Sequence, residues 1–372
     1  MKVLMLSKAC VVGIYQRKLE EMAARGVELT VAVPPEWRDE RGVQRLERVH
    51  TNGYQLIEIP IIFNGNFHLH FYPRFGQLLA QMKPDLVHID EEPYNLATWL
   101  ALRQSLRRKA KTLFFSWQNI KRRYPFPFSR LEQDVLSRAH GAIVGNAASA
   151  EVWRAKGFSG PLAVIPQFGV DPERFVEQGV ESDKRTLHAP PSTFTVGYAG
   201  RLVPEKGVDV LLRAAARAPG VQVKILGAGP EKTLLEHLVK QNGLSGRVSF
   251  APMRPSTEMP NFYTELDALV LPSRTRPNWK EQFGRVLIEA MACGVPVVGS
   301  HCGEIPNVIG DSGLLFPEEN VEALAAHLAA LRDSQPLRAE LAARGRARVL
   351  AHFTQASVAE RTVAFYQRIL AL

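Results

Sequence analysis

Cysteine is scarce in this chain. Among 372 residues there are three, Cys10, Cys293 and Cys302, and they are far apart in the sequence. Three scattered cysteines provide neither a disulfide framework nor a cysteine-based zinc site. We therefore expect a reducing, cytoplasmic compartment.

Long apolar runs are also missing. No stretch approaches the roughly 18 to 20 apolar residues that a membrane-spanning helix needs. The first residues, MKVLMLSKACVVG, hold one early lysine and a short apolar stretch, but no small-residue cleavage site follows. This pattern predicts a first β-strand and not a signal peptide.

Two further absences concern metals and disorder. No Asp-x-Asp triplet occurs, so a divalent cation clamped by such a pair of carboxylates is not expected. No tract is of low complexity, and the composition, 46% hydrophobic and 22% charged, is that of a soluble globular protein. A chain of 372 residues is too long for one ordinary core and predicts two domains.

The net charge of +9 is unevenly distributed. Residues 1–170 hold 23 Lys/Arg against 15 Asp/Glu, whereas residues 171–372 hold 23 against 22. Basic clusters occur at 107–111 and 121–123. Such a field favours anionic partners, namely nucleic acid, a phosphorylated substrate or an acidic membrane surface; a solvated basic face without a partner is the alternative. Because no zinc, helix-turn-helix or stacking-aromatic signature accompanies the charge, nucleic-acid binding is a remote alternative and we expect no such partner.

Short β-rich runs alternate with amphipathic helical patterns, such as 15–26 and 96–109, in both halves of the chain. This alternation predicts two Rossmann-like, doubly wound α/β domains with parallel sheets. Ligands of such sheets bind beyond the carboxyl ends of the strands, so we expect a cleft between the two domains. The expected strands are residues 2–7, 28–34, 85–90, 112–117, 141–146 and 162–167 in the first half, and 194–200, 221–227, 247–252, 268–273 and 295–300 in the second.

Between these halves the sequence becomes polar and irregular. Residues 171–192 end on Pro190 and Pro191 and are typical of an interdomain linker. We expect an N-terminal domain over 1–170 and a C-terminal domain over 193–352.

The stretch GYAGRLVPEKGVDVLLRA, residues 197–214, indicates a strand, a glycine turn and a helix. Arg201 and Lys206 flank the turn, and the helix N-terminus after it has unsatisfied N–H groups and a partial positive charge. A guanidinium and an ammonium beside such a terminus suit a diphosphate better than a monophosphate. Two surface cations on an ordinary loop are the alternative.

A second loop, ILGAGPEK at 225–232, contains G-x-G without the full dinucleotide fingerprint. Alone it is weak evidence for dinucleotide binding, because the same residues also suit a tight turn.

The stretch EQFGRVLIEA, residues 281–290, places two carboxylates eight positions apart. Gly284 would let the backbone approach a ligand closely. Glu289 lies in an apolar run, where its burial is costly without a partner, and a pair of sugar hydroxyls could supply the donors. Glu281 precedes the turn and would face the cleft. In the alternative interpretation, Glu289 pairs with a nearby arginine and Glu281 is solvated.

These stretches occur in one order: GR-x4-KG, LGxGP, DALVLPS, E-x7-E enclosing FG, GVPVVGS and GLLF. In this combination the chain resembles the donor-binding domain of retaining glycosyltransferases of the GT-B fold, family 4. The resemblance covers residues 194–320 in detail, and VIPQFGVDPERF at 164–175 is similar to the interdomain passage of that family.

The resemblance implies roles for individual residues. Arg201 and Lys206 would hold the donor diphosphate, Glu289 the ribose hydroxyls, and Glu281 would lie by the transferred sugar. The final helix, 353–372, would cross back to pack on the first domain. The backbone amides expected at the sugar and phosphate are those of Phe283, Gly284, Arg285 and Val286, and the base would lie near Met253, Gly227 and Gly229.

The implied function is a retaining hexosyltransferase that uses a nucleoside-diphosphate sugar, with no cofactor and no metal. The acceptor would be a glycan, a lipid-linked molecule or a small molecule. A sugar-nucleotide epimerase or a phosphorylase on the same fold is the alternative. The basic first half suggests the further hypothesis that the protein contacts the anionic inner face of a membrane peripherally, where a lipid-linked acceptor would lie.

The first domain departs from the family pattern. Many relatives have a glycine pair in the first loop, whereas SKACVVGIYQ offers only Gly13. They often place a histidine after a mid-domain strand, where this chain has FSWQNI, so Gln118 or Asn119 would supply the polar contact. Three acidic residues, Asp90, Glu91 and Glu92, end a predicted strand and would either meet the acceptor or form a solvated cluster. His88, inside an apolar strand, is expected to be a core residue.

Overall fold

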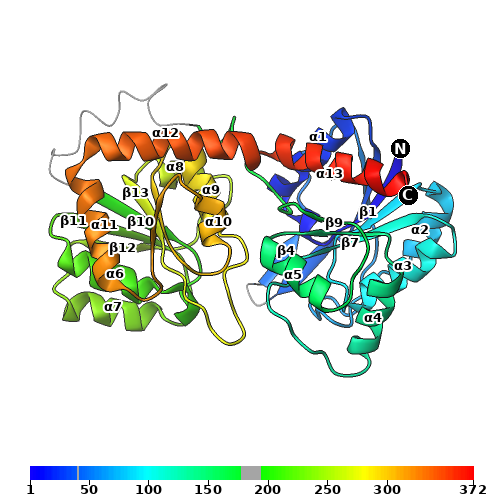
Figure 1. Ribbon diagram of the computed structural model, residues 1–372, viewed down its shortest axis with the longest axis horizontal. Coiled ribbons are helices and arrows are strands. Elements are labelled where there is room, and N and C mark those ends of the chain that lie inside the picture. Colours follow the sequence, from blue (N-terminus) through cyan, green and yellow to red (C-terminus); the bar gives the residue numbers. More distant parts are fainter. Residues whose placement is uncertain (40–41, 177–193) are drawn as a thin grey trace. The chain divides into compact units, whose positions relative to one another are not determined.

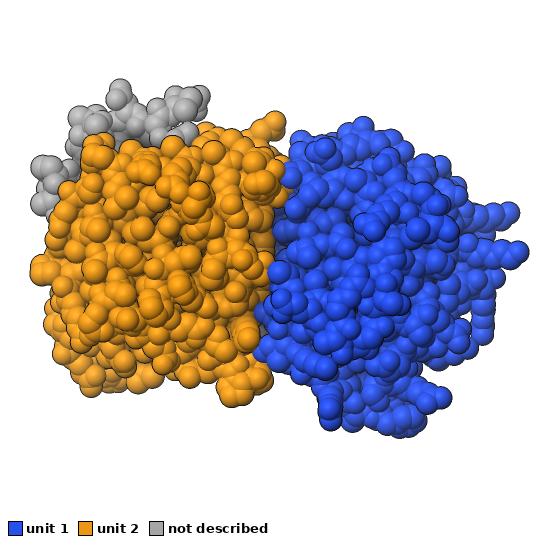
Figure 2. Space-filling view, in the orientation of Figure 1, with its two compact units in different colours: residues 1–169, 355–372 blue, residues 170–354 orange. Residues whose placement is uncertain are grey.

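The computed structural model describes residues 1–39, 42–176 and 194–372. The chain forms two compact units (Figure 2): unit 1 comprises Met1–Gly169 with Gln355–Leu372, and unit 2 comprises Val170–Thr354. Residues 177–192 of the predicted linker lie outside the described residues, and 171–176 belong to unit 2.

The core of unit 1, which is coloured blue to green in Figure 1 with its C-terminal helix in red, is a parallel sheet. This sheet has seven strands in the order β5-β2-β1-β6-β7-β8-β9. The order reverses between β1 and β6, which is the switch point at which doubly wound sheets bind ligands. The strands are β1 Lys2–Leu6, β2 Glu28–Val33, β5 Gln55–Glu58, β6 Leu86–Ile89, β7 Lys111–Ser116, β8 Gly141–Val144 and β9 Leu162–Val164. The helices are α1 Arg17–Ala24, α2 Phe75–Met82, α3 Leu96–Leu106, α4 Phe128–Arg138, α5 Ala147–Ala155 and α13 Gln355–Leu370.

Both faces of this sheet are buried. Val3 and Met5 of β1 pack into one hydrophobic cluster, while Leu4 and Leu6 pack into another. Successive strand residues point to opposite faces, so the continuous apolar run of β1 supplies both cores.

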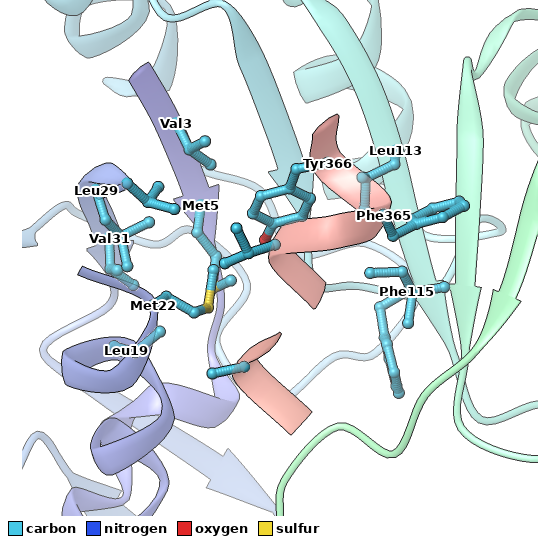
Figure 3. Close-up of a cluster of buried hydrophobic side chains, with 14 of the residues drawn as sticks. Val3, Met5, Leu19, Met22, Leu29, Val31, Leu113, Phe115, Phe365 and Tyr366 are labelled. Atoms are coloured by element: carbon cyan, nitrogen blue, oxygen red, sulfur yellow. The ribbon is translucent and has the colours of Figure 1, made fainter. Parts of the chain in front are cut away.

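The C-terminal helix α13 belongs to unit 1. Its Phe365 and Tyr366 lie in the cluster with Met5 and Met22 of β1 and α1 (Figure 3). The Tyr366 hydroxyl lies 2.6 Å from Nδ1 of His88 on β6. Burial lowers the pKa of His88 to about 3, so the imidazole is neutral. The prediction that His88 is a core residue is confirmed.

Unit 2 contains a six-stranded parallel sheet in the order β12-β11-β10-β13-β14-β15. Its switch point lies between β10 and β13. The strands are β10 Phe194–Ala199, β11 Val221–Leu226, β12 Val248–Ala251, β13 Ala268–Leu271, β14 Val297–Ser300 and β15 Leu314–Phe316. The helices are α6 Val208–Arg217, α7 Lys232–Gln241, α8 Met259–Tyr263, α9 Arg285–Ala292, α10 Ile305–Ile309, α11 Val321–Asp333 and α12 Gln335–His352.

The prediction of two parallel α/β sheets is confirmed, and each expected strand is present with its ends within three residues. The sequence pattern missed the edge strands β5 and β15 and the hairpin of β3 Glu36–Asp39 and β4 Gly42–Arg45. These elements are three or four residues long, and β5 is largely exposed, so they lack the buried apolar run that marks the central strands. No helix among the described residues is long and apolar enough to cross a membrane.

Candidate active site

The two glycine loops of unit 2 pack tightly at the ends of their strands. Gly207, the N-cap of α6, has φ +65°, and a Cβ atom there would lie 2.0 Å from the Pro272 carbonyl oxygen after β13. A Cβ at Gly227 would lie 2.0 Å from the Gly200 carbonyl oxygen, and one at Gly229 would lie 2.2 Å from that of Leu202. Glycine is therefore required by backbone packing at all three positions. For Gly227 and Gly229 this is the tight-turn interpretation of the G-x-G motif, and their predicted contact with the base stays a prediction.

A pair of glycine variants distinguishes the cost of a packing clash from the cost of placing alanine in a left-handed backbone conformation. Gly243, after α7, has a similar φ of +64°, but a Cβ there would meet nothing within 4 Å. We expect Gly243→Ala to cost about 1 kcal/mol and Gly207→Ala about 3 kcal/mol or more, because only the latter adds a backbone clash. Urea unfolding followed by circular dichroism measures both. Equal losses would contradict the packing role of Gly207.

Three polar side chains meet at the carboxyl ends of the unit 2 strands. The Lys206 ammonium lies 2.6 Å from Oε2 of Glu281, and the Ser273 hydroxyl donates to the same oxygen at 2.9 Å. Lys206 ends the 3₁₀ helix Pro204–Lys206, Ser273 follows β13, and Glu281 precedes α9. Glu281 is only 7% exposed, so the solvated alternative for this carboxylate is wrong.

Trp279 belongs to the same cluster. Lys206 Nζ lies 5.0 Å from the centroid of its ring, a cation–π distance. Backbone hydrogen bonds of 2.8 and 3.1 Å between Arg276 and Trp279 close a tight turn that holds the ring there. Sequence reasoning missed this residue, although the Pro277–Asn278 pair in the turn was a signal.

Glu289 on α9 is 3% exposed, and both of its oxygens have partners. Arg285 Nε donates to Oε1 and the Tyr263 hydroxyl donates to Oε2, each at 2.6 Å. The structure thus shows the arginine pairing that sequence analysis gave as the alternative. An ionised carboxylate has about four acceptor sites, so these two donors leave capacity for further donors. Tyr263 was not anticipated, and burial beside Glu289 raises its pKa well above the usual range.

The N-terminus of α9 lies between these two glutamates in the sequence. Gly284 caps the helix with φ +82°, and the amides of Arg285 and Val286 are in its first turn. A helix start of this kind can bind an anion. Phe283 before it is buried, with its ring 5.8 Å from that of Phe353.

The remaining predicted donor residues are less enclosed. Arg201 has a half-exposed guanidinium, 3.7 Å from a carboxylate oxygen of Glu205. Met253 is exposed after β12. The predicted roles of both residues stay predictions.

The switch point of unit 1 also contains paired charges. The Lys8 ammonium after β1 contacts the Glu91 carboxylate after β6, and the Ser7 hydroxyl donates to Asp90 at 2.6 Å. Glu91 is buried, and Glu92 accepts hydrogen bonds from the Ser116 hydroxyl at 2.6 Å and the Trp117 amide at 2.8 Å. The alternative of a solvated acidic cluster is therefore wrong.

Burial changes the proton affinity of this second cluster. It raises the pKa of Glu92 to about 7 and lowers the pKa of Lys8 to about 8. Sequence analysis missed Lys8, whose position immediately after the first strand was the available signal.

Two further residues of unit 1 that were predicted to contact the substrates, Gly13 and Gln118, have hydrogen-bond partners within the protein. The Gly13 amide donates to the Glu47 carboxylate at 2.7 Å, and a Cβ at Gly13 would lie 2.3 Å from the Val49 side chain. Gln118 is buried, donates to the Ile120 carbonyl at 2.9 Å and accepts from the Tyr124 hydroxyl at 3.3 Å. Asn119 is half-buried beside it. Gln118 therefore supports its own loop in this structure, and the predicted sugar contacts stay predictions.

Among the residues that the structure describes, no group of three or more His, Cys, Asp or Glu is placed to hold a metal ion.

The fold and the site define the class of this protein. Two doubly wound units, of which the second has a lysine–glutamate pair near a helix start, have the fold of the GT-B glycosyltransferases. The family model "Glycosyltransferase Family 4" matches residues 16–174, and the model "Glycosyl transferases group 1" matches residues 180–348. The chain belongs to family 4 of the GT-B glycosyltransferases.

Curated relatives are similar over part of their length. The chain is 32% identical to the D-inositol 3-phosphate glycosyltransferase of Mycolicibacterium smegmatis over 210 residues, which are 54% of this chain and 46% of that protein. It is 31% identical to the enzyme of the same description from Stackebrandtia nassauensis over 264 residues, 65% of this chain and 57% of that protein. The chain thus spans about half the length of these relatives.

Solved structures match over the whole chain. A sucrose-phosphate synthase from Thermosynechococcus elongatus has a TM-score of 0.75 at 23% identity and covers 100% of this chain and 99% of its own. HepE from Anabaena, in complex with UDP, has a TM-score of 0.73 at 20% identity and covers 99% of this chain and 100% of its own. At these identities the likeness shows the fold.

Proposed function

We propose that this protein transfers a hexosyl group from a nucleoside-diphosphate sugar to an acceptor hydroxyl, with retention of the anomeric configuration and without a metal ion. The observation that carries the proposal is the Lys206–Glu281 pair beside the N-terminus of α9. A partly buried ammonium with one carboxylate partner can exchange that partner for a phosphate.

Each part of the donor would have a complementary group in unit 2. Lys206, Arg201 and the first amides of α9 would bind the diphosphate, and Glu289 would accept hydrogen bonds from the ribose hydroxyls. Glu281, released from Lys206 by the phosphate, would accept hydrogen bonds from the sugar. As the bond between the anomeric carbon and the phosphate oxygen breaks, negative charge grows on the leaving diphosphate, and the fixed cation stabilises it.

The acceptor oxygen would form the new bond on the face that the diphosphate leaves. Its proton would pass to the departing phosphate oxygen, so the step needs no separate base. We place the acceptor at the carboxyl ends of the unit 1 strands, near Glu91 and Glu92.

The names of similar proteins narrow the first substrates to test. HepE was solved with UDP and with UDP-glucose, and the curated relatives are named D-inositol 3-phosphate glycosyltransferases. A uridine diphosphate sugar as donor and a small phosphorylated or glycan acceptor are therefore the first candidates. The three cysteines are buried free thiols, which supports the expected cytoplasmic location.

Titration calorimetry with UDP, GDP and ADP in the presence of a chelator tests the donor site. We expect one of the three to bind, and no binding of any of them would contradict the proposal. Incubation with donor alone separates the alternatives, since an epimerase would change the sugar without an acceptor and a phosphorylase would require phosphate. The anomeric configuration of the product, measured by NMR, tests retention.

A further inference from the structure

A loop between β13 and α9 carries Trp279. We call this segment, residues 274–280, the tryptophan loop. At its start the Arg274 amide donates to the Glu205 carbonyl at 2.8 Å. Glu205 directly precedes Lys206 in the chain, so this bond ties the start of the loop to the segment that presents the Lys206 ammonium.

Further hydrogen bonds fix the conformation of the tryptophan loop. The Thr275 amide and hydroxyl each donate to the Glu318 carboxylate, which follows β15, at 2.7 Å. The Arg276 and Trp279 backbones exchange the two bonds of the tight turn described above. Trp279 is half-buried on this braced loop. Its ring is therefore held in place before any ligand binds.

The Lys206 ammonium has two partners of different kinds. It lies 2.6 Å from Oε2 of Glu281 and 5.0 Å from the centroid of the Trp279 ring. The carboxylate accepts a hydrogen bond, so a phosphate oxygen competes with it directly. The ring attracts the positive charge through its π face and leaves the N–H groups free for an acceptor. The Lys206 side chain is only 16% exposed, so this attraction is less weakened by water than at an open surface.

We propose that Trp279 is a positioning residue of the diphosphate site. Its ring holds the Lys206 ammonium in place while a phosphate oxygen replaces Glu281 as the hydrogen-bond partner. In the free protein Glu281 also holds the ammonium, so the ring contributes more to the bound state than to the free state. Without the ring, phosphate would have to order a long and flexible side chain at the expense of binding energy. This inference rests on the proposed function, because it assigns Trp279 to the same site.

A double-mutant cycle tests whether Trp279 acts through Lys206. We expect Trp279→Leu to weaken binding of UDP, or whichever of UDP, GDP and ADP the wild-type protein binds, by about tenfold. Trp279→Phe keeps a smaller ring and should weaken it about threefold. In the Lys206→Ala background, Trp279→Leu should change the affinity less than about twofold, because the ring then has no cation to hold. Titration calorimetry measures all four corners of the cycle. Losses that add would show that the ring contacts the nucleotide itself, and the proposal would be wrong.

Fluorinated tryptophan tests whether the contact is electrostatic. Replacing tryptophan with its monofluoro and difluoro analogues weakens the negative face of the ring with little change in its shape. All five tryptophans are replaced together, so the same series is measured in Trp279→Phe. We expect the affinity to fall about twofold per fluorine in the wild-type sequence and to show no trend in Trp279→Phe. The series works even if Trp279→Leu fails to fold. A flat series in the wild-type sequence, or the same trend in both proteins, would overturn the proposal.

Trp99 on α3 supplies the matched control. It is also half-buried, and its ring centroid lies 4.8 Å from the guanidinium carbon of Arg103. Trp99→Phe should leave nucleotide affinity within about 1.5-fold, because this cation–π pair belongs to unit 1; a loss as large as that of Trp279→Phe would contradict the inference. The thermal unfolding midpoint reports on folding of every variant. No binding by the wild-type protein would overturn the proposed function together with this inference, whereas binding that does not depend on Trp279 overturns this inference alone.

Discussion

Replacing Lys206 with alanine is expected to lower kcat/KM for transfer by about 10² to 10³ and to weaken nucleoside-diphosphate binding on a similar scale. The reason is that Lys206 is the partly buried cation of the cluster, held 2.6 Å from Glu281. Steady-state kinetics and titration calorimetry measure the two effects.

The matched control for this variant is Lys224→Ala. Lys224 on β11 also pairs with a glutamate, Glu265 before β13, at 3.0 Å, but both side chains are 39% exposed. A surface pair contributes little, so activity should stay within about twofold. Because Lys206→Ala leaves Glu281 without its cation, the double variant K206A/E281Q is included to remove that buried charge. If the double variant is stable and binds the nucleoside diphosphate normally, Lys206 does not bind the diphosphate.

Replacing Glu281 with glutamine is expected to have different effects on sugar transfer and on binding of the nucleoside diphosphate. Transfer should fall by about 10², because the amide is a weaker acceptor for sugar hydroxyls than the carboxylate. Affinity for the nucleoside diphosphate alone should be unchanged or up to about tenfold tighter. In the free protein the carboxylate competes with phosphate for Lys206, and the substitution removes this competitor while keeping the shape.

Glu265→Gln, which alters the partner of Lys224, is the control for Glu281→Gln and should leave both quantities unchanged. Calorimetry with the nucleoside diphosphate and with the intact sugar nucleotide gives the comparison. If Glu281→Gln weakens binding of the nucleoside diphosphate as much as Lys206→Ala does, Glu281 acts only by positioning the lysine.

Sequence patterns located the central strands because these are continuous apolar runs buried on both faces. They also placed Glu289 in a buried helix, because its neighbours Val286, Leu287, Ile288 and Ala290 form a continuous apolar run. The same reasoning did not choose between sugar hydroxyls and an arginine as its partner. The structure shows Arg285 and Tyr263, and Tyr263 is 26 positions away in the sequence.

The sequence did not predict which charged side chains pair with one another in the two units. Lys206 and Glu281 were each singled out, but their pairing, and the position of Trp279 over the ammonium, require the end of β10 to lie beside the end of β13. In unit 1, the expectation that Glu91 would be solvated was one of two open alternatives, and the strand order decided it by placing Lys8 against the carboxylate.

The sequence by itself determined the two α/β units, their central strands and the family, because alternating apolar runs, glycine turns and motif spacing are local properties of the chain. Only the tertiary structure decided which charges neutralise each other and which groups stay exposed. The physical reason is that parallel strands pair through crossovers, so their carboxyl ends meet irrespective of separation in the sequence. The energy of a buried charge depends on those neighbours and not on the residues that adjoin it in the chain.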